Sequence, residues 1–192
     1  MTLRQTVLKL VYPLMMAFRK RKAIMLKNEK CIHPSVSFYQ LSAQLSNGKQ
    51  QSFEAFRNKK VMLVNTASDC GYTAQYSELQ MLQDKFKESL VVIGFPANNF
   101  KEQEKGDDAD IVKFCQLNFG VRFPLVKKSS ILGNEQHPVF QWLCKKELNG
   151  WNEQCPQWNF SKYLVNEEGV LTHYFGPSIG PLDKEVLNAI QP

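Results

Sequence analysis

Cys70 stands where one sequence pattern gives way to another. Residues 61–64 are continuously apolar, as in a strand buried on both faces of a sheet. From residue 72 onward apolar side chains recur at helical spacing, at Tyr72, Tyr76, Leu79, Leu82 and Phe86. We therefore expect Cys70 at or just before the first turn of a helix, where free backbone N–H groups and the helix dipole favour a thiolate. This position predicts a nucleophile, with a small inert core residue as the alternative.

The other cysteines and the histidines show no spacing typical of a metal site. Cys31, Cys144 and Cys155 are not spaced as metal ligands with one another or with a histidine, so we expect neither a metal nor a cofactor. His33, His137 and His173 each stand alone, and we assign them packing or surface roles rather than that of a general base. Five cysteines, an odd number, in a chain long enough to build its own core favour a reducing compartment such as the cytoplasm.

The order of predicted elements indicates one α/β domain. Strands and helices alternate in the middle of the chain, which predicts parallel pairing. The whole order matches a thioredoxin-like fold, a central mixed sheet flanked by helices, with an N-terminal β-hairpin. The expected elements are a hairpin of residues 37–41 and 50–53 around Asn47-Gly48, a strand at 61–64, a helix at 73–87, a strand at 90–95, helices at 109–117 and 138–148, a hairpin of 163–165 and 170–175, and a helix from Pro181.

Four sequence blocks, in order, resemble those of glutathione peroxidases. The resemblance covers about residues 35 to 190. The blocks are Asn65-Thr-Ala-Ser-Asp-Cys-Gly-Tyr-Thr73, Gly94-Phe-Pro-Ala-Asn-Asn-Phe100 with Glu102-Gln-Glu104, Phe114-Cys-Gln-Leu-Asn-Phe-Gly-Val-Arg-Phe-Pro124, and Trp158-Asn-Phe-Ser-Lys-Tyr-Leu164. The resemblance itself implies a thioredoxin fold and a peroxide-reducing activity.

The resemblance implies an active site of four residues. Cys70 stands where some members carry selenocysteine, and Gln103, Trp158 and Asn159 match the residues that complete the family's site. Peroxide reduction needs a thiolate to attack one oxygen while the departing oxygen receives a proton. An indole N–H and two amides supply donors near that developing charge. Without the resemblance, Trp158 reads as a core aromatic and Asn159 as a turn or cap residue.

The resemblance also implies a second reacting cysteine. Cys115 falls where the thioredoxin-dependent, two-cysteine, non-selenium branch of the family carries its resolving cysteine. A resolving thiol removes the sulfenic acid on Cys70 before it overoxidises. The two are not a local Cys-x-x-Cys pair, so the fold must bring them together. If Cys115 lies on the short helix expected there, we expect that segment to open locally so that the sulfurs can meet. The alternative is a buried, inert Cys115.

Several positions depart from the family pattern around Gln103. Ala97 takes the place of a frequent cysteine, and Asn99 that of a glutamine. Lys101 and Lys105 replace a glycine and a proline. These changes predict a loop with altered flexibility and more positive charge beside Gln103. Cys155, which precedes Pro156, is expected to be a bystander rather than a redox competitor.

Residues 1–34 lie outside the resemblance and read as a basic amphipathic extension of a peroxidase domain at 35–192. Apolar residues follow helical spacing from Leu3 to Phe18 and lead into the basic run at 19–22. Lys9 interrupts the apolar run, so neither a cleavable signal nor a membrane-spanning helix fits. The segment predicts peripheral contact with an acidic membrane, and the alternatives are a helix packed on the domain or a frayed basic tail. The net charge is +6, but no nucleic-acid-binding motif accompanies it, so we do not expect nucleic-acid binding.

These observations lead to one expected function and two alternatives. We expect a peroxidase that reduces hydrogen peroxide and organic or lipid hydroperoxides, with thioredoxin as reductant. One alternative is a peroxidase that glutathione reduces directly. The other is not primarily an enzyme but a peroxide sensor, which uses the same disulfide to alter a partner protein. No long insertion separates Gly133 from Trp158, where tetrameric relatives carry an interface loop, so we expect a monomer with an open site.

Overall fold

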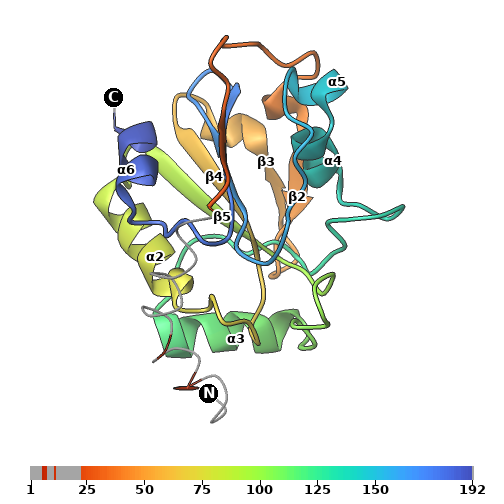
Figure 1. The fold of residues 1–192 in the computed structure, drawn as a ribbon. Coiled ribbons are helices and arrows are strands. Elements are labelled where there is room, and N and C mark those ends of the chain that lie inside the picture. Colours follow the sequence, from red (N-terminus) through yellow and green to blue (C-terminus); the bar gives the residue numbers. More distant parts are fainter. Residues whose placement is uncertain (1–5, 8–10, 12–22, 192) are drawn as a thin grey trace.

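The computed structural model describes residues 6, 7, 11 and 23–191 (Figure 1). A five-stranded sheet forms the centre, and a separate two-stranded hairpin lies beside it. The strands are β1 (Met25–Lys27), β2 (Ser42–Gln44), β3 (Gln50–Ser52), β4 (Lys60–Thr66), β5 (Leu90–Pro96), β6 (Lys162–Val165) and β7 (Leu171–Phe175). The helices are η2 (Phe38–Gln40), η3 (Phe53–Phe56), α2 (Gln75–Lys85), α3 (Asp108–Phe119), α4 (Pro138–Cys144), α5 (Lys146–Asn149) and α6 (Lys184–Ile190).

The central sheet is mixed and has the strand order β1-β7-β6-β4-β5. β4 and β5 pair in parallel over their whole length, because helix α2 carries the chain back across the sheet between them. The β4–β6, β6–β7 and β1–β7 pairs are antiparallel. The predicted mixed sheet, its central parallel pair and the hairpin between residues 162 and 175 are confirmed.

Two hydrophobic cores cover the two faces of the sheet. Successive residues of β4 alternate between them: Met62 and Val64 pack with α2, α3 and α6, whereas Val61 and Leu63 pack with η2, η3 and α4. Figure 1 shows the same division, with α2 and α6 on one side of the sheet, α4 and α5 on the other, and α3 across one end. Burial on both faces explains why β4 and β5 read as continuous apolar runs.

Three predicted boundaries are wrong in detail. The first arm of the N-terminal hairpin begins at Ser42, because residues 38–40 form η2 with Phe38 and Tyr39 buried. The expected helix 138–148 is two helices, since Lys145 between them has extended backbone angles of φ −120° and ψ 111°. The last helix begins at Lys184. Pro181 lies before it in a turn closed by a 3.0 Å bond from Asp183 N to the Gly180 carbonyl, which suits the fixed φ of proline.

Part of the segment 1–34 takes part in the sheet. Residues 25–27 form β1, which pairs with β7 along the edge of the sheet. The side chain of Asn28 is buried there and donates to the carbonyls of Ile32 and Leu171 at 2.8 and 3.2 Å. The predicted amphipathic stretch and basic run fall almost wholly outside the described residues. Within the described residues, no helix is long and apolar enough to cross a bilayer.

Candidate active site

Three loops meet at one edge of the central sheet. The loops that follow β4 and β5 emerge at the same edge because these strands are parallel. β6 runs antiparallel to β4, so its first residue and the loop before it lie at that edge as well. The loops carry Cys70, Gln103, and the pair Trp158 and Asn159, respectively. The topology therefore gathers the predicted site residues from three distant parts of the chain.

Cys70 lies in a series of tight turns between β4 and α2. Its side chain is 1% exposed, and the Tyr72 backbone N–H points at its sulfur with an N–S distance of 3.5 Å. The Thr73 N–H donates to the Cys70 carbonyl at 3.2 Å. Helix α2 begins only at Gln75, so Cys70 precedes the helix by several residues rather than lying in its first turn. Turn N–H groups, rather than helical ones, are the donors next to the sulfur.

The backbone of Gln103 is attached directly to the Cys70 loop. The Asp69 N–H donates to the Gln103 carbonyl at 2.9 Å, one residue before the cysteine. Lys101 and Glu102 have φ angles of +51° and +49°, a left-handed conformation that non-glycine residues seldom adopt. Lys101 thus occupies a position whose backbone favours the glycine that the family pattern leads one to expect.

Gln103 and Asn159 form a pair of amides. Asn159 Nδ2 donates to Gln103 Oε1 at 2.9 Å. This bond uses the Gln103 oxygen, so the Gln103 NH2 is the group that can donate to a thiolate or a peroxide. Asn159 is fully buried, and its Oδ1 has no hydrogen-bond partner in the described part of the chain. Such an orphaned acceptor suits a site that receives an O–H or S–H group.

Trp158 lies partly exposed next to the same loop. Its ring is tilted against that of Phe100, with 5.3 Å between the centroids, and Lys101 Nζ lies 5.8 Å from the centre of the indole. Phe100 and Lys101 belong to the loop that carries Gln103. The structure thus connects all three predicted donors to one another, and connects the Gln103 loop to the residue before Cys70.

Two residues that the sequence analysis did not select hold the Trp158–Asn159 turn. Buried Asn65, within β4, donates from Nδ2 to the Trp158 carbonyl at 3.1 Å and accepts from the Ser161 N–H at 3.0 Å. Lys162 donates from Nζ to the Phe160 carbonyl at 2.7 Å and to Gln75 Oε1 at 2.8 Å. Phe160 between them has a φ of +67°. The signal available in the sequence was a polar residue next to an apolar run in each case: Asn65 follows the run 61–64, and Lys162 precedes residues 163–165.

Burial shifts the protonation of two of the charged groups around the site. It raises the pKa of the Glu104 carboxyl to about 7, although hydrogen bonds from Ser68, including one of 3.1 Å from its Oγ, act in the opposite direction. It lowers the pKa of the Lys162 ammonium to about 7, against the attraction of Glu78 and Asp183. Both groups therefore titrate near neutral pH, next to the loops that carry the site residues.

Cys115 lies on the buried face of α3 and has no exposed surface. Burial raises the pKa of its thiol to about 12, although a contact with the Tyr76 hydroxyl favours the thiolate. Cys70 and Cys115 belong to the same hydrophobic core, and neither is in a disulfide. Both cysteines are buried, and Cys115 lies within a helix, so local opening of α3 before the two sulfurs react stays a prediction.

An opening of about 530 Å³ lies where the Cys70 loop, the Gln103 loop and α3 meet. It is lined by Ser68 and Asp69, by residues 102–106, and by Asp110, Ile111 and Phe114 of α3. It therefore borders both cysteine-bearing segments, although neither Cys70 nor Cys115 lines it. Among the residues that the structure describes, no group of three or more His, Cys, Asp or Glu side chains is placed to hold a metal ion.

Comparison with known proteins gives the same family as the sequence blocks. A family model described as Glutathione peroxidase matches residues 38–144. The "Glutathione peroxidase homolog BsaA" of Halalkalibacterium halodurans is 38% identical over 148 residues, which cover 77% of this chain and 94% of that protein. The "Glutathione peroxidase-like peroxiredoxin GPX5" of Chlamydomonas reinhardtii is 40% identical over 158 residues, covering 79% and 97%.

Solved structures show the same fold. The structure titled "Crystal structure of Trgpx in apo form" superimposes with a TM-score of 0.63 at 28% identity, covering 82% of this chain and 98% of that one. The family model, the sequence relatives and the similar solved structure all indicate the same family as the sequence blocks that place Cys70 in the site. The chain belongs to the glutathione peroxidase family and is a peroxidase with a thioredoxin-like fold.

Proposed function

We propose that this enzyme reduces hydrogen peroxide and organic or lipid hydroperoxides with Cys70 as the attacking thiolate. The observation that carries this assignment is the 2.9 Å bond from Asp69 N to the Gln103 carbonyl. It holds the Gln103–Asn159 amide pair to the segment that bears Cys70. Fixed donors near a developing oxyanion lower the barrier without reorganising during the reaction.

The first step breaks the peroxide bond. The Cys70 sulfur attacks one peroxide oxygen, so that an S–O bond forms while the O–O bond breaks. The departing oxygen takes up a proton and leaves as water or an alcohol, and Cys70 becomes a sulfenic acid. We assign the Gln103 NH2 and the Trp158 indole N–H to stabilise charge on sulfur and on the departing oxygen, and Asn159 to orient Gln103 through the 2.9 Å bond between their amides.

The second step uses Cys115. Its sulfur attacks the Cys70 sulfur, an S–S bond forms, and the sulfenic oxygen leaves as water. An external dithiol then reduces the disulfide by exchange, and we assign this role to thioredoxin. Support comes from sequence relatives named glutathione peroxidase-like peroxiredoxins in Chlamydomonas reinhardtii and Saccharomyces cerevisiae, and from the position of Cys115 in the same core as Cys70.

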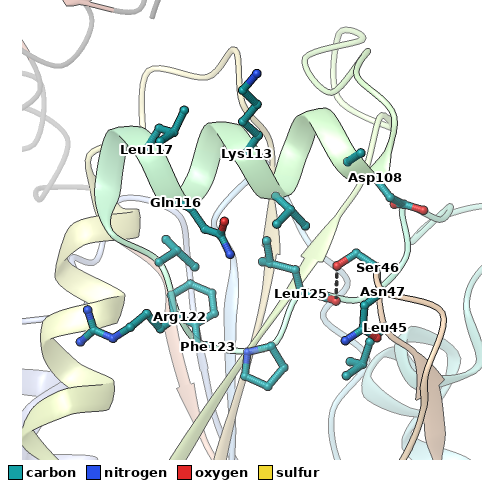
Figure 2. A pocket seen from close by; sticks show the side chains of 14 residues that line it. Leu45, Ser46, Asn47, Asp108, Lys113, Gln116, Leu117, Arg122, Phe123 and Leu125 are labelled. Carbon is teal, nitrogen blue, oxygen red and sulfur yellow. Dashed lines mark hydrogen bonds between the residues drawn. The ribbon is translucent and has the colours of Figure 1, made fainter.

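The packing of α3 favours the opening that this step needs. Only Ile111, Cys115 and Phe119 of this helix are buried. A hollow of about 640 Å³ separates the other side of α3 from residues 121–125 and the tip of the β2–β3 hairpin (Figure 2). Leu117, labelled on α3 in Figure 2, is 75% exposed. A helix with few buried contacts opens at low free-energy cost.

Steady-state kinetics test the assignment. We expect rapid turnover of hydroperoxide with thioredoxin and thioredoxin reductase, and much slower turnover with glutathione. Cys70→Ser should abolish turnover, Cys115→Ser should abolish recycling by thioredoxin, and the exposed control Cys31→Ser should change neither. Turnover no faster than that of free thiols would favour a peroxide sensor instead. Normal thioredoxin recycling in Cys115→Ser would remove the resolving role.

We further propose a monomer that acts in a reducing compartment such as the cytoplasm. All five cysteines are free thiols, as such a compartment maintains them. Peripheral contact of the basic segment within residues 1–34 with an acidic membrane rests on the sequence pattern alone. Binding of the full chain to vesicles containing phosphatidylserine, lost at high salt, is the measurement that tests it.

A further inference from the structure

A second pair of cysteines lies on the opposite side of the sheet from the Cys70–Cys115 core. Cys144 is the last residue of α4 and is 8% exposed, whereas Cys155 is partly exposed in the loop that leads to Trp158. Each thiol shifts the pKa of the other, so the two side chains are neighbours. Gln136 Nε2 donates to Cys144 Sγ at 3.5 Å and also contacts the Cys155 thiol. The Tyr163 hydroxyl contacts the Cys144 thiol as well.

Buried amides fix the chain between the two cysteines. Asn149 Nδ2 donates to the Trp142 and Asn152 carbonyls, each at 2.8 Å. Asn152 Nδ2 donates to the Leu143 carbonyl at 2.7 Å, one residue before Cys144. On the other side, the Tyr163 hydroxyl donates to the carbonyl of Gln154 at 2.8 Å, one residue before Cys155. Asn152 Nδ2 also donates to the Gln154 carbonyl at 3.2 Å, so one buried amide links the residue before Cys144 to the residue before Cys155. The fold therefore holds the two cysteine-bearing segments side by side, as an intramolecular disulfide requires.

We propose that Cys144 and Cys155 form a second redox-active dithiol, which hydroperoxides oxidise to an intramolecular disulfide independently of Cys70 and Cys115. From the sequence Cys155 is expected to be a bystander, because only the tertiary fold brings Cys144 next to it. The pair is placed differently from the proposed catalytic cysteines, since Cys155 is partly exposed in a loop and Cys144 is the last residue of its helix.

The contact assigns a role to each sulfur. The hydrogen bond from Cys144 lowers the pKa of the Cys155 thiol, and the Gln136 amide acts in the same direction against burial. The same hydrogen bond, together with burial, raises the pKa of Cys144. Cys155, which is also the more exposed, is therefore the thiolate that meets an oxidant, and Cys144 is the thiol that follows.

The reaction balances with a hydroperoxide as the only oxidant. The Cys155 sulfur attacks one peroxide oxygen, the O–O bond breaks, and the departing oxygen leaves as an alcohol or water after taking a proton. The Cys144 sulfur then loses its proton and attacks the Cys155 sulfenic acid, the S–S bond forms, and water leaves. Two electrons pass from the two sulfurs to the peroxide. An external dithiol returns them by attacking Cys155.

The disulfide can be tested without the proposed catalytic cysteines. The double variant Cys70→Ser/Cys115→Ser retains Cys31, Cys144 and Cys155. It is treated with one equivalent of hydrogen peroxide, its remaining thiols are alkylated, and it is digested with trypsin. Cleavage after Lys128, Lys145, Lys146 and Lys162 places the two cysteines on separate peptides, 129–145 and 147–162, so a disulfide appears as one linked species. Thermal unfolding of the variant confirms that it is folded.

We expect the linked peptides 129–145 and 147–162 to account for most of the oxidised protein, with Cys31 still alkylated. In a matched variant that also carries Cys144→Ser, Cys155 should stop at a sulfenic acid that dimedone traps. Oxidation of Cys31 in preference to the pair, or no linked species, would overturn the proposal. If the two peptides are linked in the wild-type protein but not in the double variant, then Cys70 or Cys115 is needed for their oxidation. That result would overturn a direct reaction of the Cys144–Cys155 pair with peroxide. Neither result bears on the proposed catalytic role of Cys70.

A second measurement does not depend on peroxide. Because the hydrogen bond from Cys144 favours the Cys155 thiolate, Cys144→Ala should slow alkylation of Cys155 by iodoacetamide at pH 7. Cys31→Ala is the control and should leave that rate unchanged. An equal rate in Cys144→Ala and the wild-type protein would contradict the paired arrangement.

Discussion

Asn65, a residue of β4, holds the segment that carries Trp158 and Asn159 through several hydrogen bonds. It is fully buried, and four of its hydrogen bonds go to residues 158–161: two from its side chain and two from its backbone. Buried hydrogen bonds of this kind contribute most through the cost of leaving a partner unsatisfied. Asn65 is therefore a positioning residue for Trp158 and Asn159.

Asn65→Asp should destabilise the protein and slow turnover. The substitution keeps the acceptor for Ser161 N–H but removes the donor to the Trp158 carbonyl and buries a carboxyl group. We expect a loss of about 2–3 kcal/mol in the free energy of unfolding and a lower kcat/KM. Urea unfolding and steady-state kinetics measure the two effects. The control Asn47→Asp lies exposed in the β2–β3 hairpin and should be nearly neutral.

Glu104 makes stability depend on pH. Its folded-state pKa of about 7 exceeds the ordinary 4.5, so the unfolded chain holds fewer protons between these values and stability falls as pH rises through that window. Glu104→Gln should remove this fall, which amounts to about 3 kcal/mol. Unfolding by urea at pH 4.5 and pH 8 provides the test. Glu102→Gln, at an exposed ion pair with Lys105, should keep the wild-type slope.

Helix α3 carries both a stable cap at each end and the cysteine that has to become exposed. At its start, the Asp107 side chain accepts from the Asp110 N–H at 2.9 Å. At its end, Gly120 adopts a φ of +65° and donates to the Cys115 and Gln116 carbonyls. The second of these caps bonds to the carbonyl of Cys115 itself. The end of the helix is thus the part whose stability controls access to that thiol.

Gly120→Ala should expose Cys115 more often. A Cβ atom at this position meets no atom within 4 Å, so the cost is the left-handed backbone alone, roughly 1 kcal/mol. We expect faster reaction of Cys115 with a thiol reagent in Cys70→Ser/Gly120→Ala than in Cys70→Ser. Gly48→Ala in the β2–β3 hairpin is the matched control, with φ +84° and equally open space. An equal acceleration by both glycine substitutions would show global rather than local opening.

The molecule as a whole places its chemistry at one edge of a sheet whose two faces are covered by separate cores. A different edge, formed by the strand β1 alongside β7 rather than by strand ends, closes one side of the sheet. The pairing of β1 with β7 and the buried Asn28 connect residues 24–28 to β7 and to Gly176. This edge therefore contributes to the stability of the domain rather than to the site.

Two truncations should separate the parts of the N-terminal segment. Removal of residues 1–22 should leave the unfolding midpoint and kcat/KM close to those of the full chain. Removal of residues 1–29 deletes β1 and Asn28, and should lower the unfolding midpoint markedly because the edge of β7 and the Leu171 carbonyl lose their partners. Equal stability of the two truncated proteins would contradict a structural role for β1.

Local patterns in the sequence determine most of the secondary structure. The continuous apolar runs of β4 and β5, the helical spacing after residue 72 and the Asn-Gly turn at 47–48 depend on neighbours a few residues away, and the structure confirms each of them. The family blocks likewise identify Cys70, Gln103, Trp158, Asn159 and Cys115 as candidates. Such features are encoded within short segments, so they can be predicted without knowing the fold.

The tertiary structure alone decides what depends on partners far apart in the chain. Three such contacts join separate segments of the chain. They are the bond between Asn159 and Gln103, the hydrogen bonds of Asn65 to residues 158–161, and the contact between Cys144 and Cys155. The incorporation of residues 25–27 into the sheet and the raised pKa of Glu104 have the same origin. Hydrogen bonding and desolvation depend on which groups the fold brings together, and that information lies in the packing of the whole chain rather than in any one segment.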